Sequence, residues 1–281
     1  MYFLQKVRFL LTDEQERPGI ETFIRQKGFG EESFEMEILD TLPAWENWGE
    51  EGVLWVTDCV LWAHSLQQRG EAVLIYLHKG NGKNDYSAFP YAMMHPEELE
   101  AEYFELIYRR MKGLPWDILE TERLAVREST VEDVDAFYEI YKEPSITAYM
   151  ENLFPTRQEE SAYIEEYIDK VYGFYDFGIW TVLEKESGKV VGRAGLSYRE
   201  GYEEPELGFV IGVPWQGRGY AREVCEAILE YGRRVLGFNR IQAFVRPENL
   251  PSLSLCRSLG FHTAESVECQ GTEYVRLLCE E

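Results

Sequence analysis

The alternation of apolar and polar positions divides the chain into two stretches. In the first, residues 1–115, two short apolar runs, Val53–Thr57 and Ala72–Leu77, flank a segment at 59–69 whose apolar positions have helical spacing. Gly70 follows this segment and ends it. A buried strand, a helix and a second buried strand at this spacing are typical of a parallel β-α-β unit. We therefore predict a small α/β, Rossmann-like domain over 1–115.

The second stretch, residues 120–281, changes several times between the strand period and the helix period. Strands are expected at Leu124–Arg127, Gly178–Leu183, Val190–Ser197, Glu206–Ile211, Arg240–Val245 and, as a terminal pair, around Val267 and at Tyr274–Leu278. Helices are expected at Val131–Tyr141, Gln158–Tyr172, from Gly219 to Leu236 and at Ser252–Leu259. This order predicts a mixed α/β domain. A helix over about Pro96–Lys112 and a linker at 114–119 are expected to precede it.

The chain is strongly acidic, with a formal net charge of −23. Such a charge repels phosphate backbones, so nucleic acid is excluded as a partner, while cationic partners such as amines are favoured. A simpler interpretation is that the charge keeps the protein soluble. Five cysteines without CxxC spacing and four scattered histidines predict neither a disulfide framework nor a metal site.

The first residues read as a strand interrupted by Lys6 and Arg8, and not as a signal peptide. No apolar run reaches the length that a membrane-spanning helix needs. We therefore expect a cytoplasmic protein without membrane contacts.

The segment Gln216–Ala221 carries the strongest chemical signal. It lies between an apolar strand and a long amphipathic helix, and its two glycines allow a tight turn and close approach of a ligand. The helix that begins here offers unpaired N–H groups and the positive end of its dipole, which suits a pyrophosphate. By itself such a turn is equally typical of ordinary α/β connections.

Three sequence matches resemble the GNAT acetyltransferase superfamily. The hexapeptide QGRGYA matches the family signature Q/R-x-x-G-x-G/A. Downstream, Asn249–Ser252 and Leu255–Phe261 are similar to the segment N-x-x-S-x-x-L-Y-x-x-L-G-F. Upstream, Glu122–Glu128 resembles the opening of the branch that includes ribosomal-protein N-terminal acetyltransferases. Because the matches occur in the family's order, we identify 120–281 as similar to a GNAT domain, with a mixed sheet flanked by helices; residues 1–115 have no part in the resemblance.

The resemblance implies an N-acetyltransferase that moves an acetyl group from acetyl-coenzyme A to an amine on a small molecule or a peptide, without a metal. Acetyl-CoA would lie in a V-shaped opening between Phe209–Ile211 and Ile241–Val245. The residues implied in binding it are Phe209, Val210 and Ile211 through their backbone, Gln216, Gly217, Arg218, Gly219, Tyr220 and Ala221 at the pyrophosphate, and Asn249 and Ser252 at the cofactor arm. Asn249 and Ser252 could equally cap a helix, and Arg218 could be solvated.

Two residues are candidates for proton transfer. An alkylamine with a pKa of about 10 must lose a proton before it attacks, and Glu206, on the strand before the loop, is the first candidate for the base. An ordinary surface glutamate beside Glu203 and Glu204 is the alternative. Cys256 stands where the family often has a proton-donating tyrosine, although packing in the core explains a cysteine more simply. Aromatic residues that could line the acceptor pocket or the core are Tyr149, Phe154, Tyr172, Tyr175, Trp180, Tyr198 and Tyr202.

The function of the first stretch is left open by the sequence. Asp58 follows a predicted strand, as nucleophilic aspartates do in haloacid-dehalogenase-type phosphatases, but the second aspartate of that motif is Val60 here. A structural or interaction role is favoured. For the whole chain, an enzyme remains to be separated from a non-catalytic acetyl-CoA-binding sensor, and the sequence leaves a homodimer open.

Overall fold

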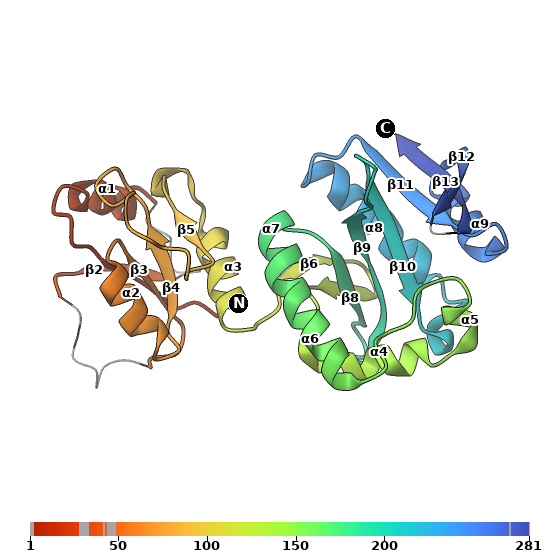
Figure 1. Ribbon diagram of the computed structural model, residues 1–281, viewed down its shortest axis with the longest axis horizontal. Helices are drawn as coiled ribbons and strands as arrows, with labels where there is room; N and C mark the ends of the chain where they lie inside the picture. The colour runs from red at the N-terminus through yellow and green to blue at the C-terminus, as the bar shows by residue number, and fades with distance from the viewer. Residues whose placement is uncertain (1–2, 28–33, 42, 44–48, 270, 281) are drawn as a thin grey trace. The chain divides into compact units, whose positions relative to one another are not determined.

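The computed structural model describes residues 3–27, 34–41, 43, 49–269 and 271–280 (Figure 1). The chain divides into two compact units, Met1–Leu114 and Pro115–Glu281, each with its own sheet. Among the described helices, none is long and apolar enough to cross a membrane.

The first unit contains a five-stranded sheet in the order β2-β1-β3-β4-β5, and its neighbouring strands run parallel. Its strands are β1 (Lys6–Leu10), β2 (Glu35–Leu39), β3 (Val53–Thr57), β4 (Ala72–Tyr76) and β5 (Ala92–Met93). Its helices are α1 (Arg17–Lys27), α2 (Val60–Gln67) and α3 (Ala101–Met111). The predicted parallel β-α-β unit is confirmed as β3-α2-β4.

Helices pack on both faces of this sheet. Phe23 of α1 and Phe104 of α3 share one core with Leu54, whereas Leu66 of α2 shares another with Trp55, the next residue of β3. Leu61, which the helical pattern placed with the apolar positions of α2, is instead 76% exposed.

The helix expected over Pro96–Lys112 is interrupted in the structure. It consists of a 3₁₀ turn at Pro96–Glu98 and the separate helix α3, because Leu99 has extended backbone angles, φ −89° and ψ 144°.

The second unit contains an eight-stranded sheet in the order β12-β13-β11-β10-β9-β8-β7-β6. Its strands are β6 (Asp117–Glu120), β7 (Leu124–Arg127), β8 (Ile179–Glu184), β9 (Val190–Tyr198), β10 (Pro205–Ile211), β11 (Arg240–Val245), β12 (His262–Cys269) and β13 (Thr272–Glu280). Its helices are α4 (Val134–Tyr141), α5 (Pro144–Thr147), α6 (Arg157–Tyr167), α7 (Gly173–Tyr175), α8 (Tyr220–Arg234) and α9 (Leu250–Ser258). Neighbouring strands are antiparallel except β10 and β11, which run parallel.

The expected strands and helices of this unit are all present, although the helix expected at Val131–Tyr141 begins with a 3₁₀ turn at Val131–Asp133. Three further differences occur. The expected linker at 114–119 includes the start of β6, which pairs with β7 as an antiparallel hairpin. The expected helix at Gln158–Tyr172 continues beyond α6 as a π-helical segment, Ile168–Tyr172. Val235 and Leu236 follow the end of α8, and Val235 is 64% exposed.

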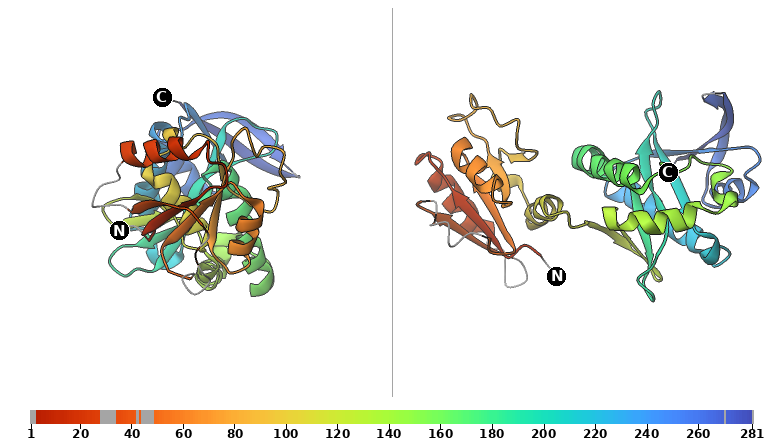
Figure 2. Two further views of the ribbon diagram at one scale, coloured as in Figure 1. Left: turned by 90° about the vertical axis from the view of Figure 1, so that its left-hand side faces the viewer. Right: turned by 60° about the horizontal axis from the view of Figure 1, so that its bottom comes forward.

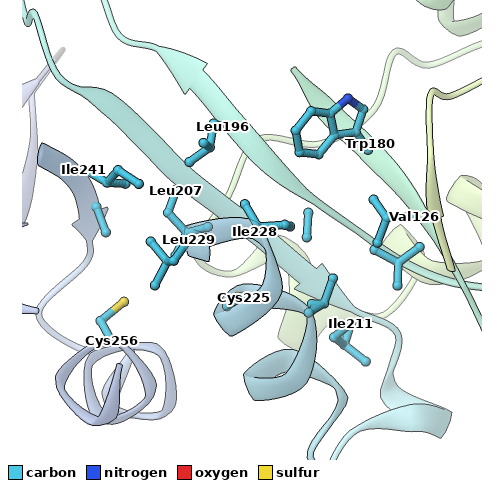
Figure 3. Packing of buried hydrophobic residues seen from close by; sticks show 14 of the residues in the cluster. Val126, Trp180, Leu196, Leu207, Ile211, Cys225, Ile228, Leu229, Ile241 and Cys256 are labelled. Carbon is cyan, nitrogen blue, oxygen red and sulfur yellow. The ribbon is translucent and has the colours of Figure 1, made fainter. Parts of the chain in front are cut away.

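The second sheet is covered on both faces (Figure 2). On one face, Cys225, Ile228 and Leu229 of α8 pack against the sheet in the largest core of the unit (Figure 3). On the other face, Phe137 of α4 and Ile164 of α6 form a smaller core. Because successive residues of a strand face opposite sides, Ala194 of β9 enters the α8 core while Arg193 lies against Phe137 of α4.

Candidate functional site

The two parallel strands of the second sheet separate and leave a cleft. In the described chain these two strands are paired at one position, where Glu206 of β10 lies opposite Gln242 of β11. By contrast, β10 is paired with β9 along its whole length, from Pro205 to Ile211. The backbone groups on the free edge of β10 are therefore available to a ligand. The cleft has a volume of about 1180 Å³. Sequence-predicted residues that line it are Glu206, Phe209, Val210, Ile211, Gln216, Ala221, Asn249 and Ser252.

The glycine loop between β10 and α8 borders this cleft through Gln216 and Ala221. Gly217 and Gly219 have positive φ angles of 74° and 85°, and Gly219 directly precedes α8. Within the described chain, the N–H groups of Gly217, Arg218 and Gly219 donate to no backbone carbonyl. The side chain of Gln216 fixes the loop to the strand through a 2.8 Å hydrogen bond from Nε2 to the carbonyl of Ile211. The loop thus offers free amides and a helix N-terminus to an anion.

The side chains of Arg218 and Tyr220 in this loop lie away from the cleft. Tyr220 donates a 2.7 Å hydrogen bond from its hydroxyl to Glu184, and Arg218 lies 3.5 Å from the same carboxylate. Neither residue lines the cleft, nor do Gly217 and Gly219. The loop residues that line the cleft are Gln216 and Ala221, so a ligand that reaches the amides of Gly217–Gly219 must extend beyond the cleft.

Arg123 braces the loop from the first hairpin of the unit. Its Nη1 donates to the carbonyl oxygen of Arg218 at 2.9 Å, and its Nε donates to Glu223 at 2.7 Å. Thr121 also donates to Glu223. Although burial acts in the opposite direction, these hydrogen bonds hold the pKa of Glu223 below its ordinary value. Glu223, in the first turn of α8, therefore contacts the same arginine that supports the loop.

Asn249 and Ser252 take part in a helix cap and also lie at the cleft, the two roles that the sequence left open. Asn249 caps α9, since its side-chain oxygen accepts a hydrogen bond from the amide of Ser252 at 3.3 Å. Both residues also line the cleft. Capping therefore places them beside any ligand of the cleft.

Glu206 lies at the point where β10 and β11 are still paired. Its carboxylate is held by Arg199, with Nε–Oε2 and Nη2–Oε1 distances of 2.6 and 3.0 Å. Arg199 in turn stacks on Phe244 of β11, with its guanidinium carbon 4.4 Å from the ring centroid. The side chain of Glu206 is 15% exposed and lines the cleft. The sequence identified this glutamate, but nothing in it indicated the arginine that occupies both carboxylate oxygens.

Cys256 lies outside the cleft. It is fully buried in the α8 core, on α9 (Figure 3). Burial raises the pKa of its thiol to about 11. This position is that of a packing residue, the role that the sequence analysis preferred.

The remaining wall of the cleft is built by α4, α5, α6 and the segments that join them. Of the aromatic candidates, Tyr149 and Phe154 line it, whereas Tyr172 and Trp180 are fully buried in the core. The sequence analysis missed Arg193, which lines the cleft from β9. A charged residue inside an apolar strand was the available signal.

The first unit has a smaller hollow of about 510 Å³ at the ends of β1, β3 and β4. Asp58 is buried there and accepts hydrogen bonds from the amide and hydroxyl of Thr12 and from the amide of Asp13. The imidazole Nε2 of His78 lies 3.5 Å from Asp58 Oδ2. Asp58 therefore joins two strand ends, and the hollow lacks the second aspartate of phosphatases at position 60.

Comparison with known proteins agrees with the geometry of the second unit. A family model described as an acetyltransferase (GNAT) domain matches residues 123–262. An uncharacterized N-acetyltransferase, p20, of Bacillus licheniformis is 31% identical over 152 residues, which are 52% of this chain and 82% of that protein. The ribosomal protein uS5-alanine N-acetyltransferase of Escherichia coli is 32% identical over 51% of this chain and 77% of its own length.

A solved structure shares the fold. The ribosomal-protein-S5-alanine acetyltransferase of Vibrio fischeri superposes with a TM-score of 0.51 at 15% identity, over 59% of this chain and 96% of its own. The matched family uses acetyl-CoA, in agreement with the open strand edge and the free amides of the loop. Through its second unit, the chain belongs to the GNAT family of acetyl-CoA-dependent N-acetyltransferases.

Proposed function

We propose that the second unit transfers an acetyl group directly from acetyl-CoA to an amine bound in the same cleft, on a small molecule or a peptide. The observation that carries this proposal is the separation of β10 and β11 above a loop with free amides. One cleft then holds both substrates, so the amine attacks the thioester carbon without an acetyl-enzyme intermediate. The products are the N-acetyl amine and coenzyme A.

In this proposal, backbone groups hold the coenzyme. The pantetheine arm pairs with the free edge of Phe209, Val210 and Ile211, and the pyrophosphate binds the amides of Gly217–Ala221. These amides are fixed before binding, since Arg123 and Gln216 support the loop. Preorganised donors of this kind lose little entropy when an anion binds.

Glu206 is the proposed base. It faces the cleft beside the strand that carries the coenzyme, and it can accept the amine's proton directly or through a water molecule. Arg199 contacts both carboxylate oxygens, and each oxygen keeps a further lone pair that can accept the amine's proton. Cys256 lies outside the cleft, so the departing thiolate is protonated by solvent in this mechanism.

Release of coenzyme A tests the proposal. The full chain is incubated with acetyl-CoA and separate amines: polyamines, amino acids, aminoglycosides and peptides with free α-amines. An N-acetyl product that forms together with coenzyme A supports the proposal, and initial rates that depend on both substrates in intersecting double-reciprocal plots support direct transfer. Parallel plots would instead indicate an acetyl-enzyme.

Binding of acetyl-CoA without turnover on any amine would favour the alternative, a sensor. Calorimetric titration with coenzyme A, performed on the same preparation, separates that result from a misfolded protein. This proposal assigns no reaction to the first unit. For that unit we keep the structural or interaction role that its sequence favours.

A further inference from the structure

Arg193 is a buried charge at the cleft. It lies on β9 opposite Val210 of β10, and its guanidinium carbon stands 4.6 Å from the centroid of the Phe137 ring. The residue is 8% exposed and also lines the cleft. Its charged end therefore borders the space that the proposed function gives to the two substrates.

In the part of the chain that the structure describes, Arg193 has the Phe137 ring beside it but no ion-pair partner. Its Nε atom is buried without a hydrogen bond, and no carboxylate lies within 4.0 Å of its nitrogens. By contrast, Arg127 and Arg276, which are also largely buried, each form an ion pair, with Asp133 and with Glu204. A buried charge without a partner is unfavourable unless a ligand supplies the opposite charge.

Two of the carboxylates that line the same cleft, those of Glu160 and Glu206, are engaged elsewhere. Glu160 is buried and accepts a hydrogen bond from the amide of Phe154, and Glu206 is paired with Arg199. The hydroxyl-bearing rings of Tyr141 and Tyr163 line the cleft together with Arg193. The surroundings thus contain further hydrogen-bond donors but leave the guanidinium unneutralised.

Arg193 and Glu206 lie on one face of the β9–β10 pair. In the β9–β10 register, Val210 is opposite Arg193, Gly208 is opposite Gly195, and Glu206 is opposite Ser197. These pairs occupy one face of the sheet, because alternate residues of a strand share a face. At Gly195 a Cβ atom would come within 2.0 Å of the carbonyl of Gly178, so only glycine fits. Glu206 and Val210 are four residues apart, or about 13 Å along the strand.

We propose that Arg193 binds a carboxylate of the acceptor, so that the acceptor is a small amine carrying a carboxylate. This inference rests on the proposed function, in which the amine is deprotonated beside Glu206. Both groups line the same cleft, so the chain of such an acceptor would run through the cleft between them. A polyamine lacks the anion and leaves Arg193 unpaired.

The charge of the whole protein is compatible with such an acceptor. A net charge of −23 disfavours anions, but an amine that also carries one carboxylate is neutral overall at pH 7. The phosphates of coenzyme A are the alternative source of an anion. They are assigned to the loop at the start of α8, which packs on the sheet face opposite to Arg193.

Matched acceptors test the inference. Rates of coenzyme A release are measured for glycine, β-alanine and γ-aminobutyrate, each against its own carboxamide. The amide keeps the amine and the chain length and removes only the negative charge. We expect at least one carboxylate to be used with a kcat/KM roughly 10- to 100-fold above that of its amide, the range for a hydrogen bond between charged groups.

Arg193→Gln is expected to remove this preference by raising KM for the carboxylate, while Arg193→Lys retains part of it. Arg157→Gln is the matched control, since Arg157 is an exposed arginine of α6 that pairs with Asp135 and does not line the cleft. A structural role of Arg193 would lower Tm in Arg193→Gln. A binding role predicts an equal or higher Tm without substrate, because an unpaired buried charge is removed.

Two results would overturn the inference. The first is equal use of carboxylates and amides by the wild type. The second is a preference that survives in Arg193→Gln, above all if calorimetry then shows weakened binding of acetyl-CoA, which would assign Arg193 to the coenzyme. If no amine is acetylated, the proposed function fails, and the carboxylate site is judged separately. γ-Aminobutyrate must then raise the Tm of the wild type and not that of Arg193→Gln, or the inference fails as well.

Discussion

Both sheets contain neighbouring parallel strands, but these strands end in different ways. In the first unit, β1 and β3 are paired at five positions, and beyond their ends Asp58 accepts hydrogen bonds from Thr12 and Asp13. In the second unit, β10 and β11 share one recorded position, Glu206 opposite Gln242, and then separate. The first arrangement joins the two strand ends through the carboxylate of Asp58. The second leaves a strand edge, a helix N-terminus and Arg193 for ligands.

This difference explains why one strand end has a clear chemical role and the other does not. At both strand ends an apolar run is followed by a polar loop, so the local sequence does not distinguish them. What separates them is whether the two parallel strands stay paired up to their ends. Changes to the open end should therefore affect binding and turnover, whereas changes to the closed end should affect stability.

The largest effect is expected from Glu206→Gln. Glutamine keeps the size and loses the proton acceptor, so kcat should fall by about 10²- to 10⁴-fold, the contribution typical of a positioned base. Acetyl-CoA affinity should change little. Steady-state rates over about pH 6–9 and calorimetry on the same variant measure both quantities. An unchanged rate across that range would make Glu206 a bystander and point to water as the base.

Gly219→Val is expected to act on binding. A β-branched residue at φ 85° is strained, and its side chain would project beside the amides of the loop. We expect acetyl-CoA affinity to fall by on the order of 100-fold, about 2.7 kcal/mol. Gly237→Val is the matched control, because Gly237 has φ 74° and open space around it beyond the other end of α8. Equal loss of affinity in both variants would show that strain alone is responsible.

At the closed end, Asp58→Ala should destabilise the first unit by about 2 kcal/mol, since two buried amides and a hydroxyl lose their acceptor. Asp58→Asn, which retains an oxygen, should cost less. Denaturant unfolding followed for each unit measures the change, and acetyl-CoA binding should remain as in the wild type. Loss of coenzyme binding in Asp58→Ala would contradict the separation of roles between the two strand ends.

Features determined by local sequence could be predicted. The β3-α2-β4 unit, strand Leu124–Arg127 and strand Arg240–Val245 follow from apolar runs bounded by polar or turn residues. The loop around Gly217 and Gly219 could be located because its chemistry lies in the backbone, and glycine marks where the backbone must turn. The interruption of the Pro96–Lys112 helix was missed, since an extended residue such as Leu99 has no distinct signature.

Features that depend on residues far apart in the chain could not be predicted. Arg123 reaches Glu223 across 100 positions, and the pairing of β6 with β7 turned an expected linker into sheet. Arg199 is seven residues from Glu206, but only the β9–β10 hairpin makes them partners. The acceptor side of the cleft is assembled from several elements in this way, so its chemistry emerged only with the three-dimensional structure.

The smallest effect is expected from Cys256→Ala, which removes a thiol that is buried in the core of the second unit. Packing predicts a loss of about 1 kcal/mol of stability with turnover nearly intact.

Burial raises the pKa of the Cys256 thiol from an ordinary 9.0 to about 11, so the folded state disfavours the thiolate. The unfolded chain therefore releases this proton first, and the contribution to stability, complete below about pH 9, should decline by roughly 1.4 kcal/mol per pH unit between pH 9 and 11. The alanine variant should lack that part of the decline. Unfolding free energies of both proteins across this range, together with kcat, test the assignment: a large fall in kcat without any change in stability would mean that the cysteine donates a proton to the leaving thiolate after all.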